Sequence, residues 1–125
     1  MQYNKKSDDK KMNEDELKSQ LQEFQNTQSQ VQMITMQLQQ LTMQENETQK
    51  ALEEIDKSQG PFYRYVSNIL VEKDKAALKK ELEEEKETIT LRLTTFKRQE
   101  EKLKTRFDEL RKKLEETAKK MKQTG

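Results

Sequence analysis

Apolar residues recur in alternating steps of three and four from Leu17 onwards, and this spacing constrains the fold more than any other feature of the chain. Such steps place the residues on one narrow stripe of an α-helix, the a and d positions of a coiled coil. A helix with so narrow a stripe buries it against another helix. The stripe of the first half comprises Leu17, Phe24, Val31, Leu38 and Leu52, with Glu45 in the same series, and Gln20, Thr27, Ile34, Leu41, Thr48 and Ile55.

A second helix with a similar stripe follows a break in the middle of the chain. Gly60-Pro61 ends the first helix, because proline cannot continue a helix. We therefore predict helices over residues 13–58 and 74–122, a disordered tail over residues 1–12 and a short tail over residues 123–125. The second stripe comprises Leu78, Leu82, Glu85, Ile89, Leu93, Phe96, Glu100, Leu103, Phe107, Leu110, Leu114, Thr117 and Met121.

The composition fits long helices better than a compact globule or a disordered chain. Hydrophobic residues make up 30% of the chain and charged residues 39%, too few apolar groups for a globular core at this length. Disordered chains are usually rich in proline and glycine or carry a high net charge. This chain has one proline, two glycines and a net charge of +1, so we do not expect it to be disordered. Balanced charge with abundant Glu, Lys, Leu and Gln is typical of coiled coils.

What the chain lacks narrows its chemistry and location. It has no Cys and no His, which removes disulfides, thiolate nucleophiles, imidazole acid–base groups and Cys/His zinc sites. The longest wholly apolar run is Ile69-Leu70-Val71, far too short to cross a membrane. The first residues are polar and of mixed charge, unlike a signal peptide. We therefore expect a cytoplasmic protein with no membrane partner and no cofactor.

Residues 59–73 differ in composition from both helices and are predicted to form one β-hairpin. Tyrosines and β-branched residues flank Ser67-Asn68, and asparagine tolerates the left-handed conformation that a two-residue turn requires. Two strands alone are marginally stable and leave unpaired edges. We therefore expect the chain to oligomerise through this hairpin. The residues assigned to assembly are Tyr63, Tyr65, Val66, Ile69, Leu70 and Val71.

The two stripes match when the helices pair antiparallel around the hairpin. Facing residues then have numbers that add to a constant, 138 for Phe24 with Leu114 and 137 along the second series. Charge favours this pairing, because residues 12–58 carry nine acids and three bases and residues 79–125 carry eleven acids and fifteen bases. The predicted fold class is all-α with a small β-hairpin, a long antiparallel two-helix coiled coil with a single hairpin insert.

The charged residues form no arrangement typical of catalysis or nucleic-acid binding. Glu83-Glu84-Glu85 is a carboxylate cluster, but a solvated coiled-coil face has no pocket to shift a pKa or exclude water. The chain also lacks a glycine-rich phosphate loop. The basic residues of the second helix are interleaved with acids and have no aromatic platform beside them. We therefore expect neither an enzyme nor a nucleic-acid partner.

Apolar residues near both ends of the chain are candidates for adaptable contacts with many apolar partners. Antiparallel pairing brings both ends to one free end of the coil, where fraying exposes side chains that otherwise pack on each other. Leu21 and three methionines fall off the stripe and suit adaptable apolar contacts. The apolar residues near this free end are Leu17, Leu21, Phe24, Phe107, Leu110, Leu114 and Met121.

The hairpin and its flanking sequences resemble the prefoldin family, and specifically its β class. Tyr63-Arg64-Tyr65-Val66-Ser67-Asn68-Ile69-Leu70-Val71 is similar to the family's Tyr-Lys-x-Val-Gly-x-Leu-Ile-Val hairpin. Lys50-Ala51-Leu52-Glu53-Glu54-Ile55 resembles the end of its first helix, and Lys97-Arg98-Gln99-Glu100 resembles part of its second. Ser67 stands where the family usually has glycine, and Glu72 where it usually has lysine. A single hairpin matches the β class, because α-class subunits carry two.

The resemblance implies a hexamer of two α-class and four β-class subunits, α2β4, whose hairpins form an inter-subunit β-barrel. It implies an ATP-independent holding chaperone that binds unfolded proteins, its clients, at the coiled-coil tips and passes them to a cytosolic group II chaperonin. The apolar residues named above near the free end of the coil are then the candidate client-binding residues. The basic residues Lys119, Lys120 and Lys122 are candidates for a contact with an acidic chaperonin surface. An archaeal β subunit and a eukaryotic subunit-six-like protein fit the sequence equally well.

The alternative function is a structural coiled-coil adaptor or tether that binds one folded partner. The hairpin and the matched helix lengths discriminate between the two, because a tether has no need of a barrel-forming insert.

Overall fold

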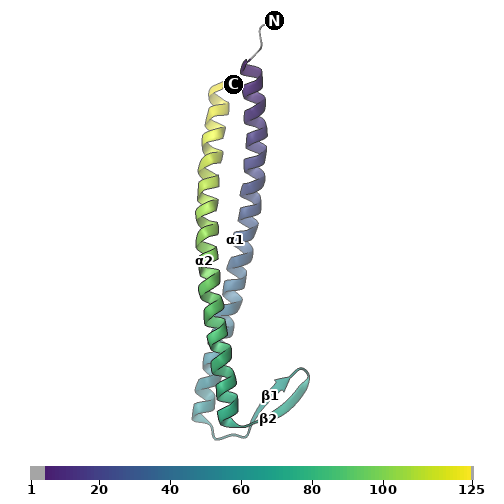
Figure 1. Ribbon diagram of the computed structural model, residues 1–125, viewed down its shortest axis with the longest axis vertical. Coiled ribbons are helices and arrows are strands. Elements are labelled where there is room, and N and C mark those ends of the chain that lie inside the picture. The colour runs from purple at the N-terminus through teal and green to yellow at the C-terminus, as the bar shows by residue number, and fades with distance from the viewer. Residues whose placement is uncertain (1–4, 125) are drawn as a thin grey trace. The chain divides into compact units, whose positions relative to one another are not determined.

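The computed structural model describes residues 5–124, with the side chains of residues 14–123. Its elements in chain order are helix α1 (Lys5–Lys57), strand β1 (Phe62–Val66), strand β2 (Ile69–Lys73) and helix α2 (Lys75–Thr124), as Figure 1 shows. Two long helices thus flank one antiparallel hairpin, which confirms the predicted fold class.

The chain divides into two compact units. The hairpin unit comprises residues 36–97, and the terminal unit comprises the described residues up to 35 and from 98 onwards. Each unit contains a segment of α1 and a segment of α2. Each therefore has a helix–helix seam of its own.

Both helices extend further toward the chain ends than predicted. Helix α1 begins at Lys5, so residues 5–12, predicted to be a disordered tail, are helical, and α2 runs to Thr124. Residues 1–4 and Gly125 lie outside the described residues. The difference has a simple cause, because no proline or glycine interrupts residues 5–13 and a helix does not need an apolar stripe at every turn.

The seam of the hairpin unit is built from the predicted stripe residues. Leu38, Leu41 and Leu93 form a buried cluster, and Ile89 and Phe96 pack against it. Burial of such leucines is worth about 2 kcal/mol each, so this cluster contributes strongly to holding the two helix segments together. The other buried hydrophobic side chains of the unit are Leu52, Ile55 and Leu78.

Polar pairs across this seam reveal the registration of the two helix segments. Thr90 donates a hydrogen bond to Glu45 at 3.1 Å, and Lys79 pairs with Asp56 at 3.0 Å. The numbers of each pair add to 135, as do those of the facing hairpin residues. These flanking polar pairs differ from the predicted constants of 137 and 138, whereas the seam residues Gln20 and Thr117 of the terminal unit meet at the predicted 137. Phe96 also packs against the cluster that contains its predicted partner, Leu41.

The terminal unit has its own closely packed seam. The ring of Phe24, which the predicted registration paired with Leu114, stacks on Phe107 with a centroid distance of 4.6 Å and an interplanar angle of 27°. Leu110 is only 1% exposed, the most deeply buried large side chain among the described residues. The buried Thr117 hydroxyl is satisfied, because it donates to Gln20 Oε1 at 2.9 Å.

Candidate assembly and client-binding surfaces

The hairpin closes through a two-residue turn at Ser67-Asn68, the place predicted from the sequence. The strands pair antiparallel from Phe62 with Lys73 to Val66 with Ile69. Ser67 has a φ of 58°. Among the residues that the structure describes, it is the one non-glycine residue in the left-handed region. The prediction had assigned that conformation to asparagine. A positive φ at the first turn position is the type II′ pattern, which favours glycine there.

The strand side chains divide between a face toward the helices and an outer face. Side chains alternate along a strand, and Phe62, Arg64, Val71 and Lys73 share the helix-facing side and are partly buried. The outer face carries Tyr63, Tyr65 and Leu70 together with Glu72, and it is open to solvent. Its exposed fractions are 52% for Tyr63, 73% for Tyr65 and 53% for Leu70.

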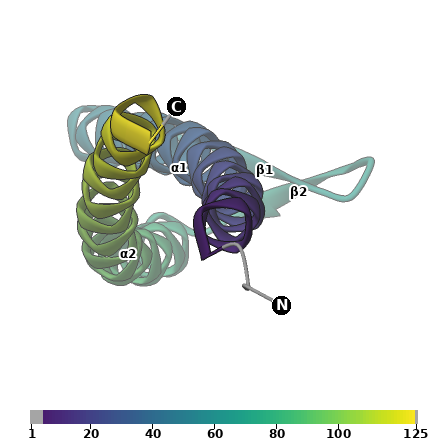
Figure 2. The same ribbon diagram turned by 90° about the horizontal axis from the view of Figure 1, so that it is seen from above.

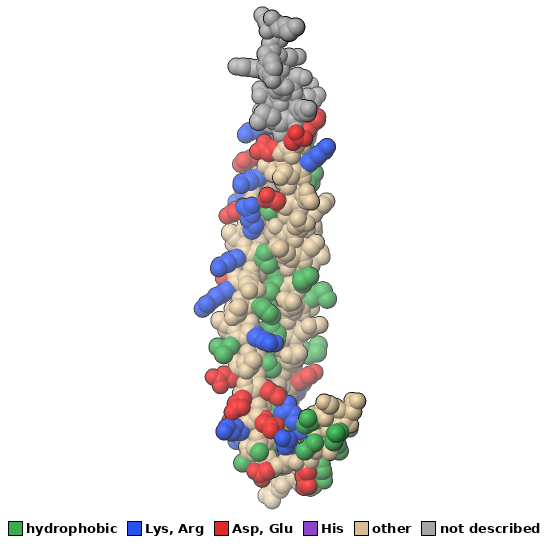
Figure 3. All heavy atoms as spheres, turned by 45° about the vertical axis from the view of Figure 1, so that its right-hand side comes forward, with side chains coloured by type: hydrophobic (Ala, Val, Ile, Leu, Met, Phe, Trp, Pro, Cys, Tyr) green, Lys and Arg blue, Asp and Glu red, His purple; other side chains and the backbone are tan. Residues whose placement is uncertain are grey.

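The hairpin tip is apolar on the other face as well. Val66 and Ile69 flank the turn and are 49% and 67% exposed, because the strands extend sideways past the cover of the helices (Figure 2). Hydrophobic side chains therefore gather on the hairpin in the space-filling view (Figure 3). The described chain contains just these two strands, so both outer strand edges are unpaired. A short apolar hairpin with free edges is a template for another strand.

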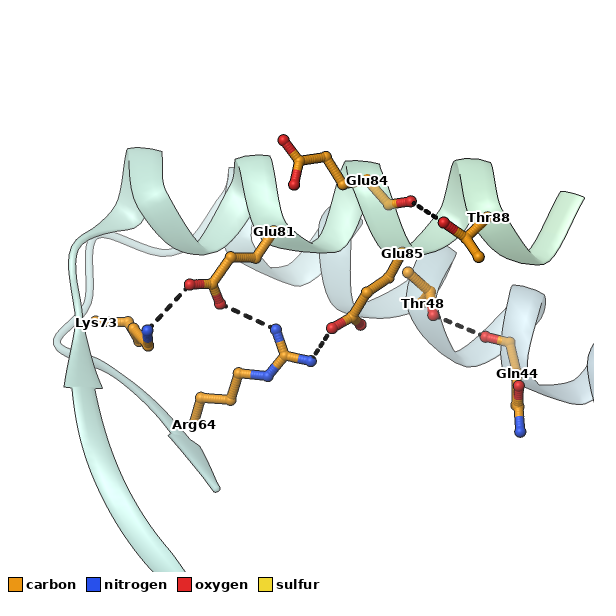
Figure 4. Close-up of polar contacts among 8 residues, drawn as sticks. All are labelled: Gln44, Thr48, Arg64, Lys73, Glu81, Glu84, Glu85 and Thr88. Carbon is orange, nitrogen blue, oxygen red and sulfur yellow. Dashed lines mark hydrogen bonds and ion pairs between the residues drawn. The ribbon is translucent and has the colours of Figure 1, made fainter. Parts of the chain in front are cut away.

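An ionic cluster anchors the inner half of the hairpin to α2 (Figure 4). Arg64 pairs with Glu81 at 3.0 Å and reaches Glu85 with its other terminal nitrogen. Lys73 on the neighbouring strand pairs with the second oxygen of Glu81, also at 3.0 Å. The Lys73 ammonium, and after it the Arg64 guanidinium, hold the pKa of the Glu81 carboxyl below its ordinary value. The cluster therefore favours one hairpin orientation while Glu81 is ionised.

A glycine and a lysine shape the connection at the base of the hairpin. Gly60 has a φ of 91°, and a Cβ there would lie 3.1 Å from the Phe62 ring, so a larger residue would be strained and crowded. Lys75 at the start of α2 donates to the Ser58 carbonyl at 3.1 Å. This bond ties the end of α1 to the start of α2.

Sequence analysis missed the ionic cluster, although a signal was present. Arg64 and Lys73 are basic residues that share one face of the predicted hairpin, and Glu81 and Glu85 lie four residues apart on one face of the helix that follows. Basic groups on a strand face beside an acidic helix face predict such pairs.

The candidate client-binding residues all lie in the terminal unit, but they differ in accessibility. Leu21 is 42% exposed, whereas Leu110 is fully buried. The remaining five are partly buried: Leu17, Phe24, Phe107, Leu114 and Met121. Leu21 can therefore contact another chain as the unit stands, while Leu110 can do so only if the helices separate.

The candidate basic residues lie near the end of α2. Lys119, Lys120 and Lys122 have solvent-exposed side chains. Among the residues whose side chains are described, no group of three or more Asp or Glu is placed to hold a metal ion. Neither described helix is long and apolar enough to cross a bilayer.

One protein-family model matches most of the chain. The model of the family described as prefoldin subunit matches residues 18–121. This chain belongs to the prefoldin family. The match includes both helix segments of each unit and the whole hairpin, so the family membership concerns the entire helix–hairpin–helix arrangement.

Individual relatives bear the same family name. The chain is 49% identical over 65 residues to the prefoldin subunit beta of Archaeoglobus fulgidus, covering 50% of this chain and 56% of that protein. It is 41% identical over 66 residues to the prefoldin subunit beta of Thermococcus gammatolerans, covering 51% of this chain and 56% of that one. These alignments span about half the length of the curated relatives.

A solved structure extends the similarity beyond those alignments. The crystal structure of the prefoldin beta subunit from Thermococcus strain KS-1 matches with a TM-score of 0.72 and 29% sequence identity, over 81% of this chain and 90% of that one. The two-helix, single-hairpin arrangement is therefore that of a prefoldin beta subunit.

Proposed function

We propose that this chain is the β-class subunit of a cytoplasmic, ATP-independent holding chaperone. Its hairpin joins α-class subunits and further copies of the chain into an α2β4-type hexamer. The ends of its helices bind unfolded proteins and deliver them to a group II chaperonin, with Lys119, Lys120 and Lys122 in that last contact.

The observation that carries this proposal is the two-sided exposure of the hairpin. Tyr65 and Leu70 on one face and Ile69 on the other are each more than half exposed. Exposed tyrosine and aliphatic side chains beside unpaired strand edges are stabilised by adding further strands. One helical partner would cover a single face, whereas closure of several hairpins into a barrel covers the apolar face and pairs the edges.

The client-binding part of the proposal rests on the terminal unit. Leu21 offers exposed apolar surface there, and its partly buried neighbours become available when helix ends fray. Several subunits, each holding one short apolar stretch weakly, retain an unfolded chain by avidity. No nucleotide is required for contacts of this kind.

The test is co-expression with a two-hairpin prefoldin subunit, followed by native mass measurement and an aggregation assay. We expect a discrete hexamer that slows aggregation of a chemically unfolded protein equally with and without ATP. A protein that stays monomeric with every two-hairpin partner, or that protects only with ATP, would contradict the proposal. Retention of one folded partner without protection of unfolded chains would favour the coiled-coil tether.

A further inference from the structure

The hairpin unit contains an apolar groove beside β1 that the ionic cluster does not fill. The groove encloses about 470 Å³ between the end of α1, the start of α2 and β1. We call it the stem groove. Its apolar lining consists of Ala51, Ile55, Phe62, Tyr63, Leu78 and Leu82.

The position of the stem groove indicates which kind of group reaches it. Phe62, Tyr63 and Arg64 of β1 form one wall, and the outer edge of β1 is unpaired in the described sheet. A strand added along that edge would place alternate side chains on the helix-facing side, over the groove. The groove is therefore continuous with the surface proposed for assembly, and Tyr63 belongs to both.

The hairpin tip has the matching chemistry. Val66 and Ile69 are exposed, aliphatic and adjacent across the sheet, and the turn between them carries no charge. The tip of the same chain cannot enter its own groove, because β1 runs from Phe62 at the groove to Val66 at the tip, about 13 Å away at 3.3 Å per residue. A tip in the groove must come from another molecule.

We propose that the stem groove receives the hairpin tip, Val66 and Ile69, of a second copy of this chain. The inference rests on the proposed assembly through hairpins and adds to it a site that sets the register between neighbouring subunits. Strand edges alone specify register weakly, because the backbone ladder repeats every two residues. An aliphatic side chain that packs between Leu82 and Phe62 favours the one strand register that buries it. Registers that leave this side chain in solvent are disfavoured.

Cysteine cross-linking tests the contact directly, since the chain contains no natural Cys. Two differently tagged variants, Ile69→Cys and Ala51→Cys, are mixed, assembled with the two-hairpin subunit and treated with a short bifunctional thiol reagent. We expect a mixed-tag dimer. Ile69→Cys with Ala118→Cys is the matched control, because Ala118 is an exposed helix residue of the terminal unit, and we expect no mixed dimer from it.

Filling the groove provides a second, independent measurement. Ala51→Phe occupies the groove without removing a core side chain, and we expect the concentration needed for assembly to rise about tenfold, as loss of one buried aliphatic contact predicts. Ala118→Phe should leave it unchanged. Circular dichroism of the two variants checks that the helices are retained.

The outcomes separate this inference from the proposed function. A complex that forms normally but gives no mixed-tag dimer overturns the groove contact and leaves hairpin assembly standing. The groove contact is likewise overturned if the Ala51→Cys chain cross-links only to the two-hairpin subunit. It is also overturned if Ala51→Phe assembles at the same concentration as the wild type. Failure of the wild-type chain to form any complex overturns the proposed function, and the groove contact with it.

Discussion

Ser67 holds a backbone conformation that its side chain disfavours. A φ of 58° brings Cβ of an L-residue close to the following carbonyl, at a cost of about 1–2 kcal/mol. We expect Ser67→Gly to stabilise the hairpin by about 1 kcal/mol, after the greater chain entropy of glycine is subtracted. Amide exchange of the strands should slow about fivefold. Asn68→Gly is the matched control, because Asn68 lacks the positive φ, and a larger gain there would contradict the turn assignment.

Glu81 couples pH to the stability of the hairpin. Its pKa is lowered in the folded chain by Lys73 first and then by Arg64. Its contribution is therefore present above the ordinary carboxyl pKa and is lost as pH falls through the lowered, folded-state pKa. We expect wild type to melt above Glu81→Gln at neutral pH, with the difference vanishing in strong acid.

Glu87→Gln supplies the comparison for that titration, since Glu87 is an exposed carboxylate on the same helix. Melting temperatures of the three proteins across the acid range make the measurement. A wild-type advantage over Glu81→Gln that grows toward acid pH would show that the carboxylate destabilises the hairpin.

At the scale of elements, the hairpin has two sets of backbone groups with different roles. In a two-residue hairpin the pair beside the turn, Val66 and Ile69, exchanges both hydrogen bonds, and the next pair, Tyr65 and Leu70, directs its N–H and C=O groups outward. Leu70→Pro therefore removes a donor from the free edge while sparing the bonds within the hairpin. We expect the helical content to remain and the hexamer to be lost.

Leu70→Val controls for the change of side chain, because it keeps the backbone N–H. Native mass spectra of both variants, each co-expressed with the two-hairpin subunit, show whether the hexamer forms. Should the Leu70→Pro protein still form a hexamer, the outer edge of β2 takes no part in assembly.

The elements themselves could be predicted from the sequence, and the reason is their periodicity. Stripe residues such as Leu41 and Leu93 are buried as expected, and Gly60-Pro61 separates α1 from β1. The registration could be predicted in part, since Gln20 meets Thr117 at the predicted constant of 137 while the flanking pair Glu45 and Thr90 adds to 135. The stem groove was also beyond reach, because it depends on the angle between the hairpin and the helices, which no local pattern encodes.

At the scale of the whole molecule, the accessible leucine and the buried leucine of the terminal unit make a discriminating pair. Leu21→Ser should weaken aggregation suppression with little change in melting temperature, because its side chain is 42% exposed. Leu110→Ser should instead destabilise the helices by about 2–5 kcal/mol, since the 1% exposed side chain leaves a cavity or a buried hydroxyl. Aggregation assays and thermal melts of the assembled complex measure both effects.

Leu91→Ser is the control for exposure alone, because Leu91 is 65% exposed in the hairpin unit. We expect protection by that variant to equal the wild type. Equal protection by Leu21→Ser as well, with the complex intact, would place client binding outside the predicted residues.

The shared constant of 135 also restricts how the length of such a chain can change during evolution. Within the hairpin unit, residues face one another at equal separations from the turn, as Glu45 and Thr90 do. A one-residue deletion in either helix would shift every pair beyond it by 100° around the axis, which no single substitution restores. Insertions and deletions should therefore be tolerated as paired events of about seven residues, one in each helix at matched distance from Ser67-Asn68, because seven residues return the apolar stripe to the seam.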